Sequence, residues 1–207
     1  MGKAIKAIIL AGGRGERLRP LTDTIPKPMV NVDGKPILEH IISLLSKNGV
    51  RDIIISLCYK PQAIEKYFGN GKKFGVKISY IREKKNNPLG TAGSLVKLKN
   101  KLTNTFLVAY GDILRELDIK KLIAFHLQKH GLGTICAYEN YKSDPKSLIT
   151  FNKNQKITSF LERPKKVFSS KAWSNASFYV FEPEIFNYIP YNKFADFGKD
   201  IFPKVLL

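Results

Sequence analysis

The chain has 207 residues, of which 43% are hydrophobic and 25% charged, and its formal net charge is +18. This length and apolar content suffice for one sizeable core, so we expect one or two domains. No apolar run approaches the about 18 residues of a membrane span, and no cleavable leader opens the chain, so we expect neither a membrane protein nor a secreted one. Cys58 and Cys136 lie in apolar runs without C-x-x-C spacing, which favours free thiols in the cytoplasm.

The positive charge has two interpretations. It could mark a surface for nucleic acid. However, the lysines are scattered, with only pairs such as Lys72-Lys73 and Lys165-Lys166, and no nucleic-acid-binding motif accompanies them. We therefore favour a solvated basic surface, which also steers small anionic substrates, and we expect no nucleic-acid partner.

The first predicted element is a buried parallel strand at the apolar run Ala7–Leu10, and the glycine-rich segment Ala11–Gly15 follows it. Glycines after a strand let the backbone turn sharply and bring its N–H groups close to an anion. Arg14 and Arg17 add guanidinium groups that suit phosphate oxygens, and Lys27 is fixed between two prolines. The segment is typical of a phosphate-binding loop with a positioned lysine.

This loop is neither of the two common phosphate loops. A Walker A motif needs Lys-Ser or Lys-Thr after its second glycine, and none stands at that spacing. Gly13 and Gly15 supply a G-x-G pair, but Leu18 occupies the place of the third dinucleotide-binding glycine. Without a longer match, an ordinary βα turn with solvated arginines remains an alternative.

After the loop, apolar patterns predict alternating helices and strands. We expect helices at 36–48, 61–68, 89–102 and 119–130, and strands at 51–59, 76–83 and 105–110. This alternation predicts a single α/β domain with a doubly wound, mostly parallel (Rossmann-like) sheet. Short strands expected at 134–138, 147–152, 157–161 and 177–181 follow closely in sequence, which indicates a smaller antiparallel part beside the main sheet.

Asp112 follows the predicted strand at 105–110 through Gly111. Ligands of open α/β sheets bind at the carboxyl ends of the parallel strands, so we expect the glycine loop and Asp112 to share one cleft. A carboxylate at such a strand end suits Mg²⁺. By itself, Gly-Asp is also a common turn dipeptide.

The longer string beginning at Gly12 decides between these alternatives. It reads G-G-x-G-x-R-L-x-P-L-T, then P-K-P-M, then Gly34-Lys35-Pro36, and it resembles the signature of the sugar-1-phosphate nucleotidylyltransferases. The resemblance implies transfer of a nucleotidyl group from an NTP to a sugar 1-phosphate, with Arg17, Lys27 and Asp112 as catalytic residues. It implies nucleotide binding by Leu10, Ala11, Gly12, Gly13, Arg14 and Gly15, and a Mg²⁺ cofactor on Asp112.

A further motif, Leu89–Gly93, lies where the family packs a loop against the base and ribose, which implies nucleotide binding by Gly90 and Thr91. Glu83 stands where relatives carry a glutamine or glutamate toward the base. A carboxylate can accept both N1–H and N2–H of guanine, whereas uracil or thymine prefers an amide. Glu83 therefore favours GTP, although an exposed glutamate facing Arg82 or Lys84 is an equal alternative.

The sugar side is indicated by two motifs. Glu162-Arg163-Pro164 resembles the family's E-K-P motif, with arginine in place of the lysine that holds the sugar phosphate. Asn175-Ala176-Ser177 resembles N-A-G, with Ser177 where glycine is usual. The resemblance thus implies sugar-phosphate binding by Glu162, Arg163 and Asn175.

Asp200 is the second candidate metal ligand. It closes the string D-F-G-K-D, which looks like a stretch of glucose-1-phosphate nucleotidylyltransferases in which the second aspartate completes the metal site. An acidic first turn of a surface helix is the alternative.

Taken together, the motifs favour GTP and mannose 1-phosphate as substrates. UTP, dTTP or ATP with glucose 1-phosphate is the second choice, and a non-catalytic sensor on the same fold is the third. A sensor is expected to lose Arg17, Lys27 or Asp112, and all three are present. Family members usually continue beyond the D-F-G-K-D region, so we expect one catalytic domain, 1–207, that lacks the usual C-terminal end. Homo-oligomerisation stays open.

Overall fold

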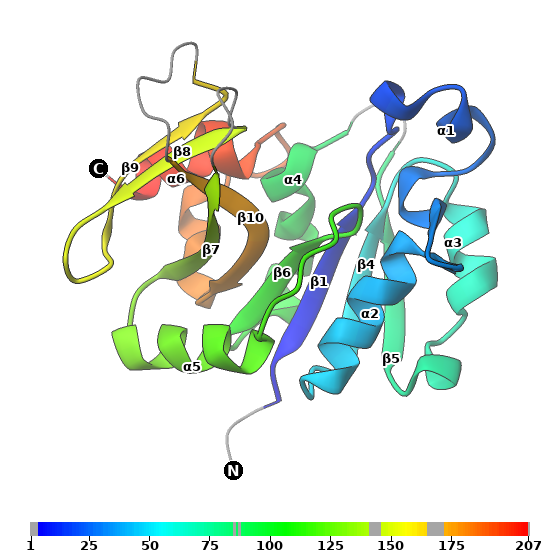
Figure 1. Ribbon diagram of the computed structural model, residues 1–207, viewed down its shortest axis with the longest axis horizontal. Helices are drawn as coiled ribbons and strands as arrows, with labels where there is room; N and C mark the ends of the chain where they lie inside the picture. The colour runs from blue at the N-terminus through cyan, green and yellow to red at the C-terminus, as the bar shows by residue number, and fades with distance from the viewer. Residues whose placement is uncertain (1–3, 85, 87, 141–145, 165–171, 207) are drawn as a thin grey trace.

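The computed structural model describes residues 4–84, 86, 88–140, 146–164 and 172–206. One sheet runs through the molecule, with helices packed on both of its faces (Figure 1). Its strand order is β5-β4-β1-β6-β10-β8-β9, and β7 pairs with β10 beside this path. The strands are β1 (Lys6–Ala11), β4 (Asp52–Leu57), β5 (Lys77–Arg82), β6 (Phe106–Tyr110), β7 (Gly133–Asn140), β8 (Ser147–Phe151), β9 (Ile157–Glu162) and β10 (Ala172–Phe181).

The parallel half of the sheet is built around β1. It pairs in parallel with β4 on one side and β6 on the other, and β5 continues the parallel arrangement beyond β4. Ala7, Ile8 and Ile9 are fully buried, because β1 carries apolar residues toward both faces. Such continuous apolar runs are typical of parallel strands covered by helices on both sides.

The antiparallel half begins at β10. This strand lies antiparallel to β6, to β7 and to β8, and β9 is antiparallel to β8. The pairing of β10 with β7 shifts register between Asn175 and Tyr179, which marks a bulge in the longest strand.

Two apolar cores lie on opposite faces of the sheet. The face that includes Ala7 and Ile9 packs against α2 (Ile37–Lys47), α3 (Pro61–Phe68) and α5 (Ile119–Lys129). Ile8 points to the other face, which is covered by the 3₁₀ helices η4 (Ser94–Lys101) and η5 (Pro183–Tyr188) and by α6 (Phe202–Val205). The remaining short elements are η1 (Glu16–Leu18), α1 (Leu21–Thr24), η2 (Lys27–Met29), β2 (Asn31–Val32), β3 (Lys35–Pro36), η3 (Lys72–Phe74), α4 (Gly90–Gly93) and η6 (Phe197–Ile201).

The doubly wound, mostly parallel α/β fold is therefore confirmed, and so is its antiparallel part. One predicted element differs: the single helix expected at 89–102 is a short α4 followed by the 3₁₀ helix η4. The N–H groups of Ala92 and Gly93 donate to the carbonyl oxygen of Ala195, at 2.9 and 3.1 Å, which ties α4 to a distant segment. Within the described residues, no helix is both long and apolar enough to span a membrane.

Candidate active site

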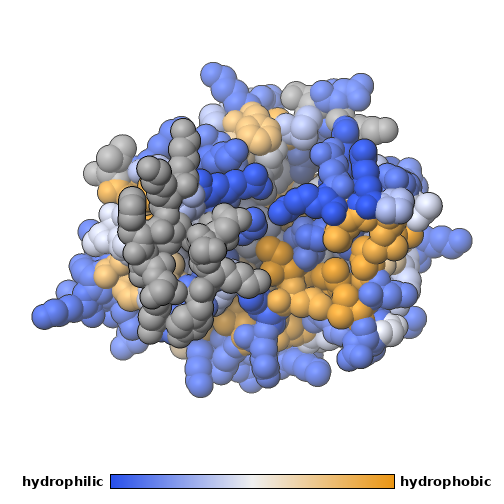
Figure 2. Space-filling model, turned by 45° about the horizontal axis from the view of Figure 1, so that its top comes forward, coloured by the Kyte–Doolittle hydropathy of each residue, from blue (hydrophilic) through white to orange (hydrophobic). Residues whose placement is uncertain are grey.

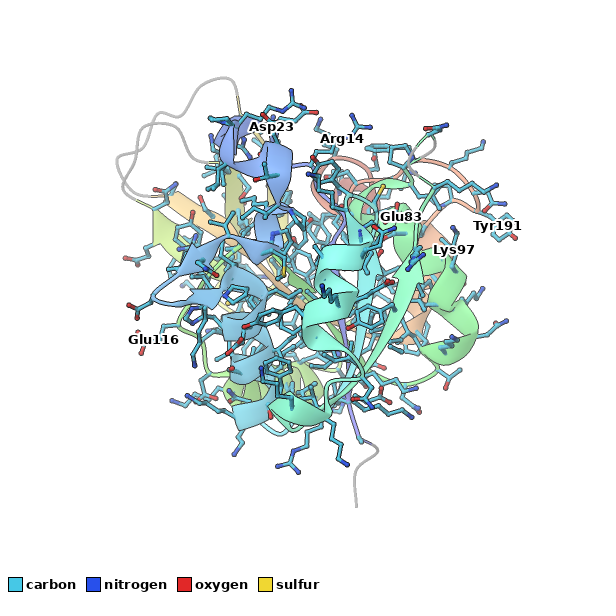
Figure 3. All side chains as sticks on the ribbon, turned by 90° about the vertical axis from the view of Figure 1, so that its right-hand side faces the viewer. Arg14, Asp23, Glu83, Lys97, Glu116 and Tyr191 are labelled. Atoms are coloured by element: carbon cyan, nitrogen blue, oxygen red, sulfur yellow. The ribbon has the colours of Figure 1, made fainter. Side chains whose placement is uncertain are left out.

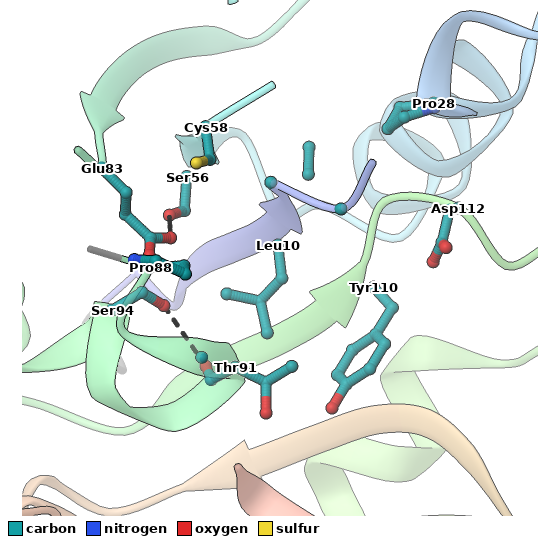
Figure 4. Close-up of a pocket in the computed structure, with 14 residues that line it drawn as sticks. Leu10, Pro28, Ser56, Cys58, Glu83, Pro88, Thr91, Ser94, Tyr110 and Asp112 are labelled. Carbon is teal, nitrogen blue, oxygen red and sulfur yellow. Dashed lines mark hydrogen bonds between the residues drawn. The ribbon is translucent and has the colours of Figure 1, made fainter. Parts of the chain in front are cut away.

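The glycine loop opens onto a cleft at the carboxyl end of β1. In Figure 2, which looks toward this edge of the sheet, hydrophobic residues form a patch that hydrophilic side chains border. The close-up in Figure 4 shows the cleft between Glu83 at one end and Asp112 at the other, with β1 and β6 between them. Its volume is about 290 Å³, and its lining residues are Leu10, Ala11, Gly12, Gly13, Pro28, Ser56, Cys58, Glu83, Pro88, Gly90, Thr91, Ser94, Tyr110 and Asp112.

Gly15 ties the loop to the segment that carries Lys27. Its φ of 66° lies in the left-handed region, and a Cβ there would approach Lys27 Cβ and Thr22 Cγ2 to 2.9 Å. Thr22 Oγ1 donates to the Gly15 carbonyl oxygen at 2.8 Å. Only glycine combines this conformation with this close approach, so the loop stays tightly folded against Lys27.

The two predicted arginines lie on the outer side of the loop. Arg14 and Arg17 are exposed, and neither is among the residues that line the cleft. Figure 3 shows Arg14 at the surface, at the same end of the molecule as Glu83. Their guanidinium groups are therefore available to an anion that extends out of the cleft.

Lys27 and Asp112 form an ion pair. Lys27 Nζ donates to Asp112 Oδ2 at 2.7 Å, and the two side chains are 24% and 30% exposed. Asp112 also lines the cleft, so the predicted meeting of the loop and this carboxylate occurs.

Glu83 is held at the other end of the cleft by two donors. Ser56 Oγ donates to Glu83 Oε1 at 3.1 Å, and the backbone N–H of Leu89 donates to Glu83 Oε2 at 3.0 Å. Ser56 is the fifth of the six residues of β4 and is 1% exposed, and its apolar neighbours in the chain offer no polar pattern from which its role could be predicted. The carboxylate therefore faces into the molecule and does not pair with Lys84.

Gly90 and Thr91 join the cleft to the segment before η6. Gly90 has φ 76°, and a Cβ there would lie 2.6 Å from the Ala195 carbonyl oxygen. Thr91 Oγ1 donates to Asp196 Oδ2 at 2.9 Å and accepts from the Phe197 N–H at 3.0 Å. Asp196, the first aspartate of the D-F-G-K-D string, is thus a positioning residue that the sequence did not indicate.

Asn175 is linked to the cleft-lining Tyr110 through Tyr179. Its Nδ2 donates to Tyr179 Oη at 2.7 Å, and its Oδ1 accepts from the Ser177 N–H at 2.8 Å. Tyr179 is fully buried and packs edge-on against Tyr110, with 6.0 Å between the ring centroids. Burial raises the pKa of Tyr110 to about 12, so this cleft-lining phenol stays neutral. The Asn175 amide is therefore already oriented by its own strand.

Glu162, at the end of β9, packs against η6. A Cβ on Gly198 would lie 2.6 Å from Glu162 Oε2, so glycine permits this contact. Burial first, and the nearby Asp196 carboxylate second, raise the pKa of Glu162, while Arg163 and Lys199 act in the opposite direction. Arg163 is exposed, with φ 49°. Glu162, Arg163 and Asn175 lie outside the lining of the cleft itself.

Residues 6–207 match the family model described as nucleotidyl transferase. The chain belongs to this family. It is 35% identical to a UTP–glucose-1-phosphate uridylyltransferase of Synechocystis and 33% identical to a mannose-1-phosphate guanylyltransferase of Mycobacterium tuberculosis. Each of these alignments covers 98% of this chain and 55% of the relative, so the chain spans about half the length of these curated relatives.

A solved structure has the same fold. HddC from Yersinia pseudotuberculosis, in a complex with GMP-PN, superposes with a TM-score of 0.79 at 31% identity. The match covers 97% of this chain and 86% of that one. The resemblance to sugar-1-phosphate nucleotidylyltransferases is therefore confirmed at the level of family and fold.

The carboxylates near the cleft suit a cation whose remaining ligands come from a bound substrate. In the described part of the chain, no three His, Cys, Asp or Glu side chains gather around a common metal position. Asp112 faces the cleft, whereas Asp200 Oδ2 accepts from the Asp196 N–H at 2.7 Å and Asp200 lies outside the cleft lining. A site with one or two carboxylates suits Mg²⁺, which binds through few protein ligands and through substrate phosphates.

Proposed function

We propose that this chain transfers a nucleotidyl group from an NTP to a sugar 1-phosphate and releases pyrophosphate. The observation that carries the proposal is the Lys27–Asp112 pair, at 2.7 Å, beside a glycine loop at the carboxyl edge of the sheet. A lysine can bind phosphate oxygens and a carboxylate can bind a divalent cation, so the pair suits a reaction that brings phosphates and a cation together. A sensor would need neither group.

The proposed reaction requires no general base. An oxygen of the sugar 1-phosphate attacks the α-phosphorus, the bond to the β-phosphate oxygen breaks, and pyrophosphate leaves with the bonding electrons. Because the nucleophile is already an anion, the main barrier is the repulsion between two polyanions. Arg17 and Arg14 would bind the triphosphate and the departing pyrophosphate, and Lys27 would contact the α-phosphate and the attacking phosphate.

We further propose Mg²⁺ as the cofactor, held by Asp112 with Asp200 as the second carboxylate. When bound, the cation would neutralise the negative charge that develops on the leaving pyrophosphate. Asp200 Oδ2 accepts one hydrogen bond, from the Asp196 N–H, and the carboxylate keeps other acceptor positions for the cation. The protein's own contribution is to place Asp112 beside Lys27.

The preferred substrates in this proposal are GTP and mannose 1-phosphate. Glu83, at the nucleotide end of the cleft, offers a carboxylate to the guanine edge, while Gly90 and Thr91 would contact the base and ribose. Glu162, Arg163 and Asn175 would bind the sugar phosphate. A guanylyltransferase is among the relatives and supports this pair, whereas the Synechocystis uridylyltransferase supports UTP and glucose 1-phosphate as the second candidate.

The remaining expectations are part of the same proposal. The chain would be a single catalytic domain that acts on small anions in the cytoplasm, without nucleic acid.

A substrate matrix tests this proposal. GTP, ATP, UTP and dTTP are each combined with mannose 1-phosphate and glucose 1-phosphate in Mg²⁺, and pyrophosphate release is measured. We expect the highest kcat/KM for GTP with mannose 1-phosphate. A best pair with UTP or dTTP would refute the guanine assignment but not the reaction class, and no release from any pair would refute the proposed activity.

A further inference from the structure

Glu83 is a side chain whose two oxygens are held by different donors. Ser56 Oγ donates to Oε1, and the Leu89 backbone N–H donates to Oε2, at 3.1 and 3.0 Å. Ser56, Glu83 and Gly12 all line the cleft, and Figure 4 shows the Ser56 hydroxyl directed at the carboxylate. A Cβ on Gly12 would lie in van der Waals contact with Glu83 Oε1, at 3.6 Å, so glycine leaves this oxygen uncovered by a side chain at position 12.

The count of lone pairs shows what this arrangement offers to a ligand. An ionised carboxylate has about four acceptor positions, two on each oxygen. Ser56 and Leu89 occupy one position on each oxygen, which leaves one acceptor on each. The Glu83 carboxylate therefore presents two adjacent acceptor positions, one on each oxygen, and these complement a ligand with two adjacent donors. Guanine has such an edge, formed by N1–H and the 2-amino group.

We infer that Ser56 is a positioning residue that selects the guanine base by fixing the orientation of the Glu83 carboxylate. The inference deepens the proposed function, because it rests on a nucleotide in this cleft. Leu89 contributes a backbone N–H, which every substitution except proline retains, so Ser56 is the donor that a side-chain truncation can remove. With Ser56 alone removed, the carboxylate is held at one oxygen only, and its plane can rotate away from the base.

The test compares GTP with ITP, which lacks only the 2-amino group. We expect the parent chain to bind GTP roughly ten- to a hundredfold more tightly than ITP, because a hydrogen bond to a charged group is lost. Ser56→Ala should lower this GTP/ITP ratio by about tenfold, mainly by weakening GTP. Ser56→Thr keeps the hydroxyl group and should therefore keep the GTP/ITP ratio of the parent chain. Binding is measured by calorimetry, so the result does not depend on turnover.

Two further variants show that Ser56 acts through Glu83. In a Glu83→Gln background, Ser56→Ala should leave the GTP/ITP ratio unchanged, because the oriented carboxylate is already gone. Ser94→Ala is the matched control: Ser94 lines the same cleft and is 1% exposed, but its Oγ donates to the Thr91 carbonyl oxygen at 3.3 Å. This control should retain the parent ratio.

Turnover separates the two proposals. If the chain prefers GTP to ITP in a Ser56-dependent way but releases no pyrophosphate, the inference about Ser56 holds and the proposed activity is refuted. In contrast, the inference is overturned if the parent chain does not distinguish GTP from ITP, or if Ser56→Ala weakens both nucleotides equally. In a catalytically active chain, Ser56→Ala should raise KM for GTP while kcat stays within about twofold.

Discussion

At the scale of single residues, the Lys27–Asp112 pair concentrates opposite charges at the cleft. The two residues are 85 positions apart in the chain, and both side chains remain about a quarter exposed. Partly exposed ion pairs contribute about 0–1 kcal/mol to stability. The pair is therefore a weak structural contact whose placement suits a catalytic role.

The first prediction concerns this pair. Lys27→Ala and Asp112→Asn should each lower kcat by roughly 10²–10³, because each removes charge that acts on the rearranging phosphates. Arg17→Ala should behave in the same way. The thermal midpoint should change little in each case. Pyrophosphate release and thermal unfolding measure the two effects.

A matched ion pair provides the control for that experiment. Lys6 and Asp52 pair at 3.5 Å at the opposite end of the sheet, with side chains 40% and 37% exposed. Lys6→Ala should leave both activity and midpoint near the parent values. Loss of folding in Lys27→Ala, with normal activity of the folded remainder, would show that Lys27 is structural.

Glu162 carries the second prediction. Burial and Asp196 raise its pKa above the ordinary 4.5, so the folded state binds a proton at a pH where the unfolded chain has lost it. Its stabilising contribution is present below the unfolded pKa and is lost as pH rises through the folded pKa. Glu162→Gln should therefore become more stable relative to the parent as pH rises from about 4 to 7.

Thermal midpoints across this pH range measure that difference. Glu184→Gln is the control, because Glu184 is exposed in the first turn of η5. A stability difference for Glu162→Gln that does not change with pH would contradict the raised pKa. The same substitution should weaken sugar 1-phosphate binding if Glu162 has its proposed role.

At the scale of elements, α4 depends on a distant segment. Ala92 and Gly93 donate their N–H groups to Ala195, and a Cβ on Gly93 would lie 2.6 Å from the Lys193 carbonyl oxygen. The contact brings Thr91 to Asp196 and thereby shapes the floor of the cleft. Backbone on both sides leaves no flexible side chain that could move aside.

The third prediction tests this packing. Gly93→Ala should destabilise the fold by about 1–3 kcal/mol, because the added methyl group forces the two backbones apart. It should also raise KM for the nucleotide through Thr91. Gly131→Ala is the control, since the added Cβ would lie in ordinary van der Waals contact, 3.7 Å from the Gly133 carbonyl oxygen. Denaturant unfolding measures the effect, and equal stabilities of the two variants would contradict it.

At the scale of the whole molecule, β10 joins two parts with different proposed tasks. The parallel strands carry the glycine loop, Glu83 and Asp112 at their carboxyl ends, and the antiparallel part carries Glu162 and Asn175. Tyr110 on β6 and Tyr179 on β10 pack together at this junction. The proposed sites for the nucleotide and for the sugar phosphate would thus lie on one continuous sheet, which fixes their geometry relative to each other.

The sequence by itself determined the class of fold and the existence of the loop. The alternation of apolar runs and amphipathic helices follows from local periodicity. The strand boundaries differ from the predicted ranges by at most two residues except in β10, which begins five residues earlier than predicted. The glycines at 12, 13 and 15 likewise reflect local requirements of the backbone conformation. Such features depend on neighbours in the chain, so they can be read without the fold.

Only the tertiary structure decided which side chains meet. The Lys27–Asp112 pair joins η2 to the segment after β6, 85 positions away, and the Ser56–Glu83 hydrogen bond joins β4 to the end of β5, 27 positions away. The same is true of Asp196, which reaches Thr91 across 105 positions. These contacts are set by sheet order and core packing, which are long-range properties, and therefore no local pattern could specify them.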